Sequence, residues 1–347
     1  MGAGMGRNAK FNRKSINVKN MTSLQDFGLL FVILIGGVIL SFASDVFATG
    51  LNFRNVALAS TVVAVMAIGQ TFVILVAGID LSVGAMLALS SVLSVGFTIK
   101  QGLPVGVSIV LALLVGLFVG LINGLSVTVL NIPPLIATLA SMSIVRGFAY
   151  IYSGGMNITP TPDIFSQFQE ATVFGVPLVI IFTLVLGVIA HITLTKTSFG
   201  RQVFSTGGNA LASKLAGIRV NRVIIYCYMI SGLCAALAGI LLSARLDAGA
   251  ATAGMGYELT VISACVIGGV SLFGGEGKIG AVFLGVLLLA LVQNAINLLE
   301  VPANYDYVVS GLVIAAAASL DVYRRGLVDA GLKRSSSAQK VESPEEK

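Results

Sequence analysis

Apolar runs long enough to cross a bilayer fill most of this chain, and one long polar segment interrupts them. The segment covers residues 197–222 and contains basic residues but no acidic one. A polar segment of this length between apolar runs has to lie outside the hydrocarbon, and basic segments of membrane proteins stay in the cytoplasm. The sequence therefore predicts a cytoplasmic loop, with the docking of a soluble partner as its role. The basic residues are Arg201, Lys214, Arg219 and Arg222.

The composition agrees with a chain embedded in a membrane. Of its residues 56% are hydrophobic and 10% are charged, whereas soluble domains contain about 25% charged residues. The net charge of +6 does not predict nucleic-acid binding, because the basic residues gather near the termini and in the polar segment, as membrane topology requires. The single histidine excludes a zinc site of the HExxH type, and we expect no cofactor.

Ten apolar runs predict ten membrane-spanning helices. Helices are favoured because the runs are long and continuous, whereas a membrane strand alternates apolar and polar residues over about ten positions. The balance of lysine and arginine places both termini in the cytoplasm. The expected spans are residues 27–47, 55–76, 81–99, 105–130, 134–152, 173–194, 223–244, 259–273, 279–299 and 307–322.

The fold class that follows is an all-α polytopic membrane protein in three parts. We expect a cytoplasmic N-terminal segment over residues 1–26, a transmembrane domain over residues 27–323 and a cytoplasmic tail over residues 324–347. The loop at 197–222 lies within the second part and carries the short docking helix described below.

Two short motifs indicate an inverted internal repeat. DLSV (80–83) opens the third span and ELTV (258–261) opens the eighth, and the spans that follow them carry Asn123 and Asn294 in similar apolar settings. Five spans separate the copies, so the copies would face opposite ways, as in transporters whose pathway lies between two inverted halves. A match of four residues also arises by chance, which leaves the repeat a hypothesis.

Glycines carry two further predictions. Gly116, Gly120 and Gly124 lie four residues apart in the fourth span, which favours close packing on another helix over the lining of a polar pathway. GGEGK at 274–278 has only part of the phosphate-loop pattern, because Leu272 stands where the first glycine is required and Ile279 follows the lysine. We expect a tight turn there.

Polar side chains inside spans are costly, and they usually face the protein interior or a cavity. Arg146 is expected to pair with Glu258 or Asp247, or to extend to the outer surface. Asp80 is expected to cap the third helix, or to act as a gate or substrate contact. The residues that could line a translocation path are Asp80, Ser82, Asn123, Arg146, Tyr150, Glu258 and Asn294.

The polar segment contains a short helical pattern that ends at Gly217. Leu211 and Leu215 are four residues apart and form an apolar face, which either presses into a groove on a partner or lies on the membrane surface. The candidate docking residues are Gly207, Gly208, Asn209, Leu211, Leu215 and Gly217.

Four stretches of the chain resemble the permease subunits of bacterial ABC importers for monosaccharides, of the ribose, arabinose and xylose type. They are VAGIDLSVGAMLAL (76–89), LIATLASMSIVRGFAYI (135–151), SFGRQVFSTGGNALASKLAGI (198–218) and YELTVISACVIGGVSLFGGEGKIG (257–280). The resemblance covers nearly the whole chain after the N-terminal segment.

The resemblance implies a non-catalytic translocation subunit in the bacterial inner membrane. Its implied partners are a second permease chain in a homodimer, a cytoplasmic ABC ATPase on the coupling helix, and a periplasmic sugar-binding protein that delivers the sugar. Gly217 matches the glycine that ends the family's coupling-helix motif. Family members often carry glutamate after the asparagine, where this chain has Ala210, so Leu211 and Leu215 would make more of the contact.

Three alternatives stay open at this point. An ion-coupled secondary transporter would use an intramembrane acid, for which Asp80 is the candidate. A membrane-embedded enzyme would need a cluster of acids or histidines at mid-membrane, and none is visible in the sequence. An ABC permease for nucleosides or branched-chain amino acids would share the architecture and differ in cargo.

Overall fold

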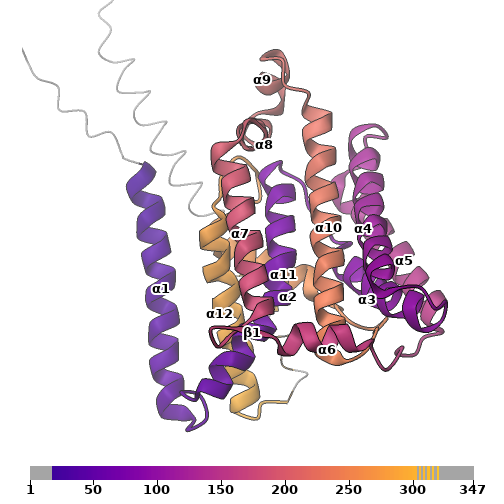
Figure 1. Cartoon of the computed structure of the whole chain (residues 1–347). Helices are drawn as coiled ribbons and strands as arrows, with labels where there is room; N and C mark the ends of the chain where they lie inside the picture. Colours follow the sequence, from indigo (N-terminus) through magenta and orange to yellow (C-terminus); the bar gives the residue numbers. More distant parts are fainter. Residues whose placement is uncertain are drawn as a thin grey trace, which may run out of the picture.

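The computed structural model describes residues 18–302 and positions 305, 308, 311, 312, 315 and 319, with side chains from residue 28 onward. This part of the chain is almost entirely helical (Figure 1). Its helices are α1 (Val18–Ala43), α2 (Gly50–Leu75), α3 (Val83–Ile99), α4 (Val105–Thr128), α5 (Pro134–Ser153), α6 (Asp163–Glu170), α7 (Leu178–Lys196), α8 (Ser198–Gly208), α9 (Ala210–Leu215), α10 (Val220–Leu246), α11 (Tyr257–Ile267) and α12 (Ile279–Leu298). A short antiparallel hairpin of β1 (Thr172–Val173) and β2 (Val176–Pro177) precedes α7.

Six helices of the described part are long and apolar enough to cross a membrane: α2, α4, α5, α7, α10 and α12. Three shorter apolar helices accompany them, namely residues 28–43 of α1, α3 and α11. Every expected span up to residue 299 falls on one of these helices. The tenth expected span, 307–322, lies largely outside the described residues.

Two expected spans extend beyond their helices by five residues or more. The sixth was expected from residue 173, but Phe174 and Gly175 take positive φ values of 52° and 79° and form the tip of the β1–β2 hairpin, so α7 begins five residues later, at Leu178. The eighth was expected to reach residue 273, but α11 ends at Ile267 because Gly268 and Gly269 (φ 80°) follow it. Glycine at these positions favours a turn over a continued helix.

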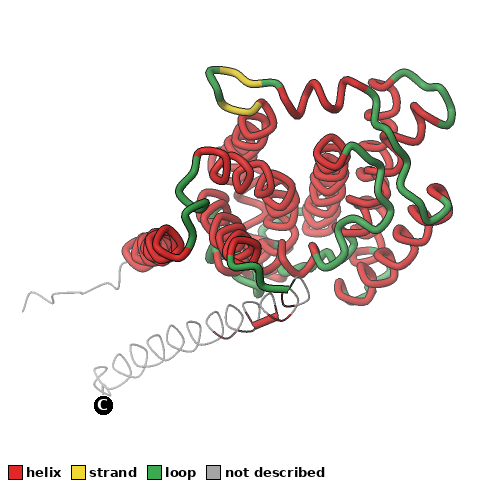
Figure 2. Tube along the Cα trace, turned by 90° about the horizontal axis from the view of Figure 1, so that it is seen from below, coloured by secondary structure: helices red, strands yellow, loops and turns green. Residues whose placement is uncertain are grey.

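The core forms around α2, α3 and α10. Helix α3 packs between α4, α5 and α10, and its residues 83–96 are all buried. Most of them are small or β-branched, which lets neighbouring backbones come close. Helix α12 packs on α2 and α11, whereas α1 contacts α12 at one edge of the bundle (Figures 1 and 2).

The glycine spacing on α4 produces close helix packing, as expected. A Cβ built on Gly116 would lie 2.6 Å from the carbonyl oxygen of Gly232 in α10, and one built on Gly124 would lie 2.8 Å from the Cα of Ile225. A Cβ on Gly120 would overlap the carbonyl oxygen of Tyr228. The three glycines therefore face α10 rather than an open pathway.

The bundle has two distinct ends (Figure 1). Helices α8 and α9 cover one of them, called the α9 end below. Helix α6 and the β1–β2 hairpin lie at the other, called the α6 end. Helices α2 and α10 run the full distance between these ends, and α3 and α11 are shorter.

Candidate functional site

The chain between α2 and α3 leaves the helical conformation inside the bundle. Ala77 has a positive φ of 59°, and the N–H of Gly78 returns to the carbonyl of Val73, which ends α2. The carbonyl of Ile79 accepts hydrogen bonds from the Tyr228 hydroxyl at 3.2 Å and from the Thr138 hydroxyl at 3.3 Å. Side chains of α10 and α5 thus satisfy an irregular backbone that would be costly in lipid.

Asp80 is fully buried at this break and joins it to two other helices. Its carboxylate accepts hydrogen bonds from the N–H and hydroxyl of Ser82, at 3.0 and 2.6 Å, and from the hydroxyl of Ser231 in α10, at 2.8 Å. The Asn123 amide of α4 donates to the Ser82 hydroxyl at 2.9 Å. The expected hydrogen bond from the N–H of Ser82 to Asp80 is present, but Ser82 itself is the N-cap of α3 and the helix start has no side-chain cap hydrogen bond, so Asp80 does not cap the helix. Asp80, Ser82 and Asn123, three of the candidate path residues, form one buried network.

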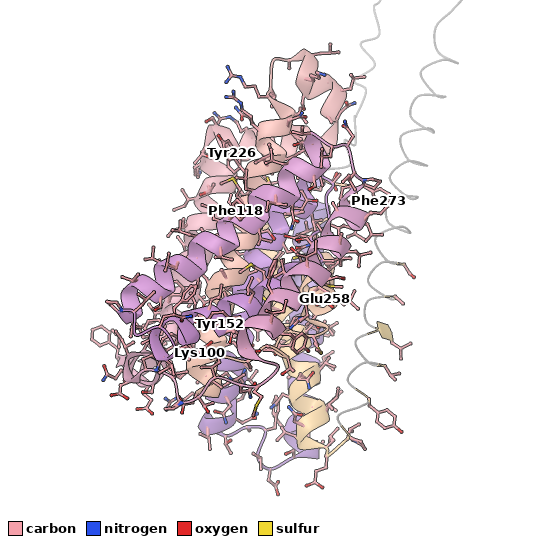
Figure 3. All side chains as sticks on the ribbon, turned by 90° about the vertical axis from the view of Figure 1, so that its right-hand side faces the viewer. Lys100, Phe118, Tyr152, Tyr226, Glu258 and Phe273 are labelled. Carbon is pink, nitrogen blue, oxygen red and sulfur yellow. The ribbon has the colours of Figure 1, made fainter. Side chains whose placement is uncertain are left out.

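A second irregular segment, residues 247–256, connects α10 to α11. It runs beside α3: Gly249 packs on Ser91, whose hydroxyl accepts from the N–H of Ala250 at 3.1 Å, and Gly254 packs on Gly84. A Cβ on Gly84 would lie 2.5 Å from both the Gly254 carbonyl oxygen and a carboxylate oxygen of Glu258. The starts of α3 and α11 therefore lie against each other, and Figure 3 shows Glu258 between the levels of Tyr226 and Lys100.

Arg146 holds this second segment in place. Its Nη1 donates to the carbonyl oxygens of Ala251 at 2.8 Å and Ala253 at 2.6 Å. The expected close ion pair is not formed: among the described residues no carboxylate oxygen of Glu258 or Asp247 lies within ion-pair distance of Arg146, and Glu258 interacts with it only through longer-range charge attraction. The reason is that unpaired carbonyls of an irregular backbone lie within its reach and need a donor.

Asp247 has a different partner at the α6 end. It accepts hydrogen bonds from the N–H and the hydroxyl of Thr161, which hold the pKa of its carboxyl below the usual value. Tyr150 lies one turn after Arg146 on the same face of α5 and is half-buried. Arg146 and Glu258 thus lie near the start of α11, with Tyr150 close to Arg146.

Asn294 lies apart from the other candidate path residues. Its amide and that of Asn52 exchange two hydrogen bonds, at 2.8 and 3.1 Å, and Asn52 also donates to the carbonyl of Phe47. This pair ties α12 to the start of α2. The settings of Asn123 and Asn294 therefore differ, although the sequence made them look alike.

An apolar cavity of about 640 Å³ opens between α3, α4 and α5. Most of its lining is aliphatic or aromatic, for example Leu93, Phe118 and Phe148. The candidate path residue Asn123 is one of its few polar lining residues, so the surface offers few partners to the hydroxyl groups of a polar ligand, whose burial without partners is costly. The start of α11, with its carbonyls and charged groups, is better suited to a polar ligand.

The polar segment folds as two helices, α8 and α9. The hydroxyl of Thr197 caps α8 by accepting from the N–H of Gly200 at 3.1 Å, and the Asn209 side chain caps α9 by accepting from the N–H of Ala212 at 2.9 Å. Gly217 has φ 84° and follows the end of α9, as expected. Helix α8 was not expected, although Thr197 before Ser198 is a recognisable N-cap signal.

The apolar face of α9 is open. Leu211 is 70% exposed and Leu215 is 83% exposed, whereas Ser213 on the opposite side is buried against Ser205, with 2.8 Å between the hydroxyl oxygens. The basic residues of the segment are exposed around these leucines. Exposed leucines on a short, capped helix form a surface suited to a groove on another protein.

Comparison with known proteins agrees with the resemblance noted in the sequence. Residues 52–318 match the family model described as branched-chain amino acid transport system / permease component. The ribose import permease protein of Bacillus subtilis (strain 168) is 43% identical over 303 residues, which cover 87% of this chain and 93% of that protein.

Two further relatives come from Escherichia coli (strain K12). Its L-arabinose transport system permease protein is 41% identical over 300 residues, covering 86% of this chain and 91% of that protein. Its D-allose transport system permease protein is 36% identical over 296 residues, covering 85% of this chain and 91% of that protein. No solved structure matches the chain significantly. The chain belongs to the family of branched-chain amino acid transport system / permease components.

Proposed function

We propose that this chain is the permease subunit of an ATP-driven ABC importer and that it passes a monosaccharide into the cell. The observation that carries the proposal is the similarity, at 36–43% identity over at least 85% of the chain, to permeases named for ribose, arabinose and allose. The family description names branched-chain amino acids, but these relatives favour a sugar. ATP hydrolysis would take place on a separate chain.

The path for the sugar would run past the facing starts of α3 and α11. At 1.5 Å per residue, the 17 residues of α3 extend about 25 Å and the 11 residues of α11 about 16 Å, less than the hydrocarbon core of a bilayer. Short helices preceded by irregular backbone often mark the substrate site of transporters built from inverted repeats. DLSV and ELTV stand at these two helix starts, which supports the repeat.

Groups around these helix starts suit a hydroxyl-rich cargo. Glu258, Tyr150 and the backbone of residues 251–256 could exchange hydrogen bonds with sugar hydroxyls, which lowers the cost of removing their water. Arg146 would keep this backbone in place. The contacts would be few and weak, as suits a carrier whose selectivity lies in the protein that delivers the sugar.

The proposed topology has ten spans, the tenth over residues 307–322, with both termini in the cytoplasm of a bacterial inner membrane. The three parts would be the N-terminal segment 1–26, the permease domain 27–323 and the tail 324–347. Basic residues favour the α9 end as the inner one. They are Lys196, Arg201, Lys214, Arg219, Arg222 and Lys278, whereas the α6 end carries Asp45, Asp163, Glu170 and Asp247 beside Arg54, Lys100 and Arg245.

Labelling of single introduced cysteines tests this orientation. Phe174 at the hairpin tip is fully exposed at the α6 end, and Lys214 is exposed on α9. In right-side-out membrane vesicles, we expect a membrane-impermeant maleimide to label Phe174→Cys at once and Lys214→Cys only after permeabilisation. The native cysteines Cys227, Cys234 and Cys265 are buried, so the wild-type chain supplies the background. The reverse pattern would show that the topology is inverted.

The proposed assembly has two copies of this chain, a cytoplasmic ABC ATPase on α9 and a sugar-binding protein at the α6 end. ATP binding and hydrolysis on the partner would move α9 and shift the population between conformations open to either side. The exposed leucines of α9 support the docking of a protein at that end.

Reconstituted transport tests the function itself. Proteoliposomes would contain this chain with an ATPase and a binding protein encoded beside it. From a panel with ribose, arabinose and allose, we expect uptake of at least one labelled sugar. The uptake should require ATP on the side of the membrane that carries the ATPase, and leucine should not be taken up. Leucine uptake would overturn the sugar assignment. Uptake by the chain alone under a sodium or proton gradient would support the ion-coupled alternative instead.

A further inference from the structure

Three glycines at the α9 end form a contact between segments that are far apart in sequence. The end of α8, at Gly207, meets the last turn of α2 and the turn at Gly274 and Gly275 that follows α11. The N–H of Gly275 donates to the carbonyl of Leu75 at 2.9 Å. We call this contact of Gly207, Gly274 and Gly275 with residues 75–77 the glycine junction.

The glycine junction is a contact of backbone on backbone. A Cβ built on Gly207 would overlap the carbonyl oxygen of Leu75 and lie 2.6 Å from the nitrogen of Gly275. A Cβ on Gly274 would lie 2.9 Å from the nitrogen of Ala77, and one on Gly275 would lie 2.8 Å from the Cα of Gly208. No side chain that could change its rotamer separates these segments, so a displacement of one has to move the others.

The glycine junction lies between the proposed docking helix α9 and the two short helices α3 and α11. On one side, Gly207 is separated from α9 only by Gly208 and Asn209. On another side, Ala77 leads through Ile79 and Asp80 into α3. On the third side, Gly274 and Gly275 belong to the turn that connects α11 to α12.

We propose that the glycine junction transmits movement of α9 to the starts of α3 and α11, with Gly207 as a positioning residue for transport. The proposal rests on the proposed function, because it assumes a partner that moves α9. The physical requirement is a contiguous, stiff contact between the docking surface and the elements that line the path. The hydrogen bond from Gly275 to Leu75 and the backbone contacts of Gly207 meet that requirement.

Gly207 and Gly280, in the first turn of α12, provide a matched pair of variants. Neither glycine has a positive φ, so an alanine acts through contact alone, and a Cβ on the exposed Gly280 would meet nothing within 4 Å. In proteoliposomes with the ATPase and binding protein, we expect Gly207→Ala to keep the ATPase bound while sugar uptake per ATP hydrolysed falls about tenfold, an effect in the range of measured couplings between distant sites. We expect Gly280→Ala to stay within about twofold of the wild type.

The outcomes separate this proposal from the proposed function. If the wild-type chain neither binds the ATPase nor transports sugar, the proposed function fails. If the wild type transports and Gly207→Ala equals Gly280→Ala in uptake per ATP, the junction proposal is overturned. If Gly207→Ala does not fold, Ala77→Gly replaces it, because glycine accepts the φ of 59° and makes the link to Ile79 flexible. Unchanged uptake per ATP in Ala77→Gly also overturns the proposal.

Discussion

Replacement of both Leu211 and Leu215 by aspartate is expected to release the ATPase from this chain and to abolish ATP-driven sugar uptake. The two leucines are 70% and 83% exposed in the free chain, so their burial in a groove of the partner would contribute strongly to docking. At about 1.5–3 kcal/mol per fully buried leucine, the loss of both corresponds to an affinity lowered by about 100-fold or more. Co-purification of the ATPase and uptake in proteoliposomes measure the two effects.

A second pair of alanines supplies the control for this variant. Ala212 and Ala216 are also exposed and four residues apart, so Ala212→Asp with Ala216→Asp adds the same two charges and keeps both leucines. We expect most of the ATPase to co-purify with this control variant. If both variants lose the ATPase to the same extent, the effect comes from the added charge. If the leucine variant retains the ATPase fully, α9 lies on the membrane surface instead of in a groove of the partner.

Replacement of Asp80 by alanine is expected to lower the stability of the whole bundle. The carboxylate accepts hydrogen bonds from Ser82 and Ser231 in a fully buried position, and its loss leaves buried hydroxyl and N–H groups without this acceptor. A buried donor left without its acceptor costs about 1–3 kcal/mol, and three donors are affected, so we expect a loss of about 3 kcal/mol or more. A thiol-reactive fluorophore measures unfolding in detergent, because all three cysteines are buried in the folded chain.

Two further variants serve as comparisons for Asp80→Ala. Asp80→Asn keeps the shape and one carbonyl acceptor, so we expect a smaller decrease in unfolding temperature than with alanine. Ser143→Ala removes an exposed hydroxyl that bonds only to the carbonyl of Leu139 in its own helix, and we expect almost no change. An Asp80→Ala chain that unfolds at the wild-type temperature would show that the network does not stabilise the fold.

Local signals in the sequence predicted most of the long helices and the short helix α9. The apolar runs located the spans, Asn209 and Gly217 bounded α9, and the spacing of Gly116, Gly120 and Gly124 predicted the packing of α4. Each of these depends on residues close together in sequence or on one helix face. The sequence could therefore indicate them without a knowledge of the partner helix.

Features that depend on distant residues were not predictable in the same way. The sequence suggested an acid as the partner of Arg146, because charge is visible in a sequence and unpaired carbonyls of Ala251 and Ala253 are not. Nothing in the sequence shows that Gly207 meets Gly275, since 68 positions separate them and the sequence suggested a docking residue for one and a tight turn for the other. The inverted repeat stays a prediction.

Helix α1 stands at the edge of the bundle, and among the described helices α12 is its main neighbour. The part of the chain that matches the family model begins at residue 52, after this helix. Helix α1 therefore adds little to the packed interior, which forms around α2, α3 and α10. A protein engineer could attach a reporter or an affinity handle to it with little disturbance of that interior.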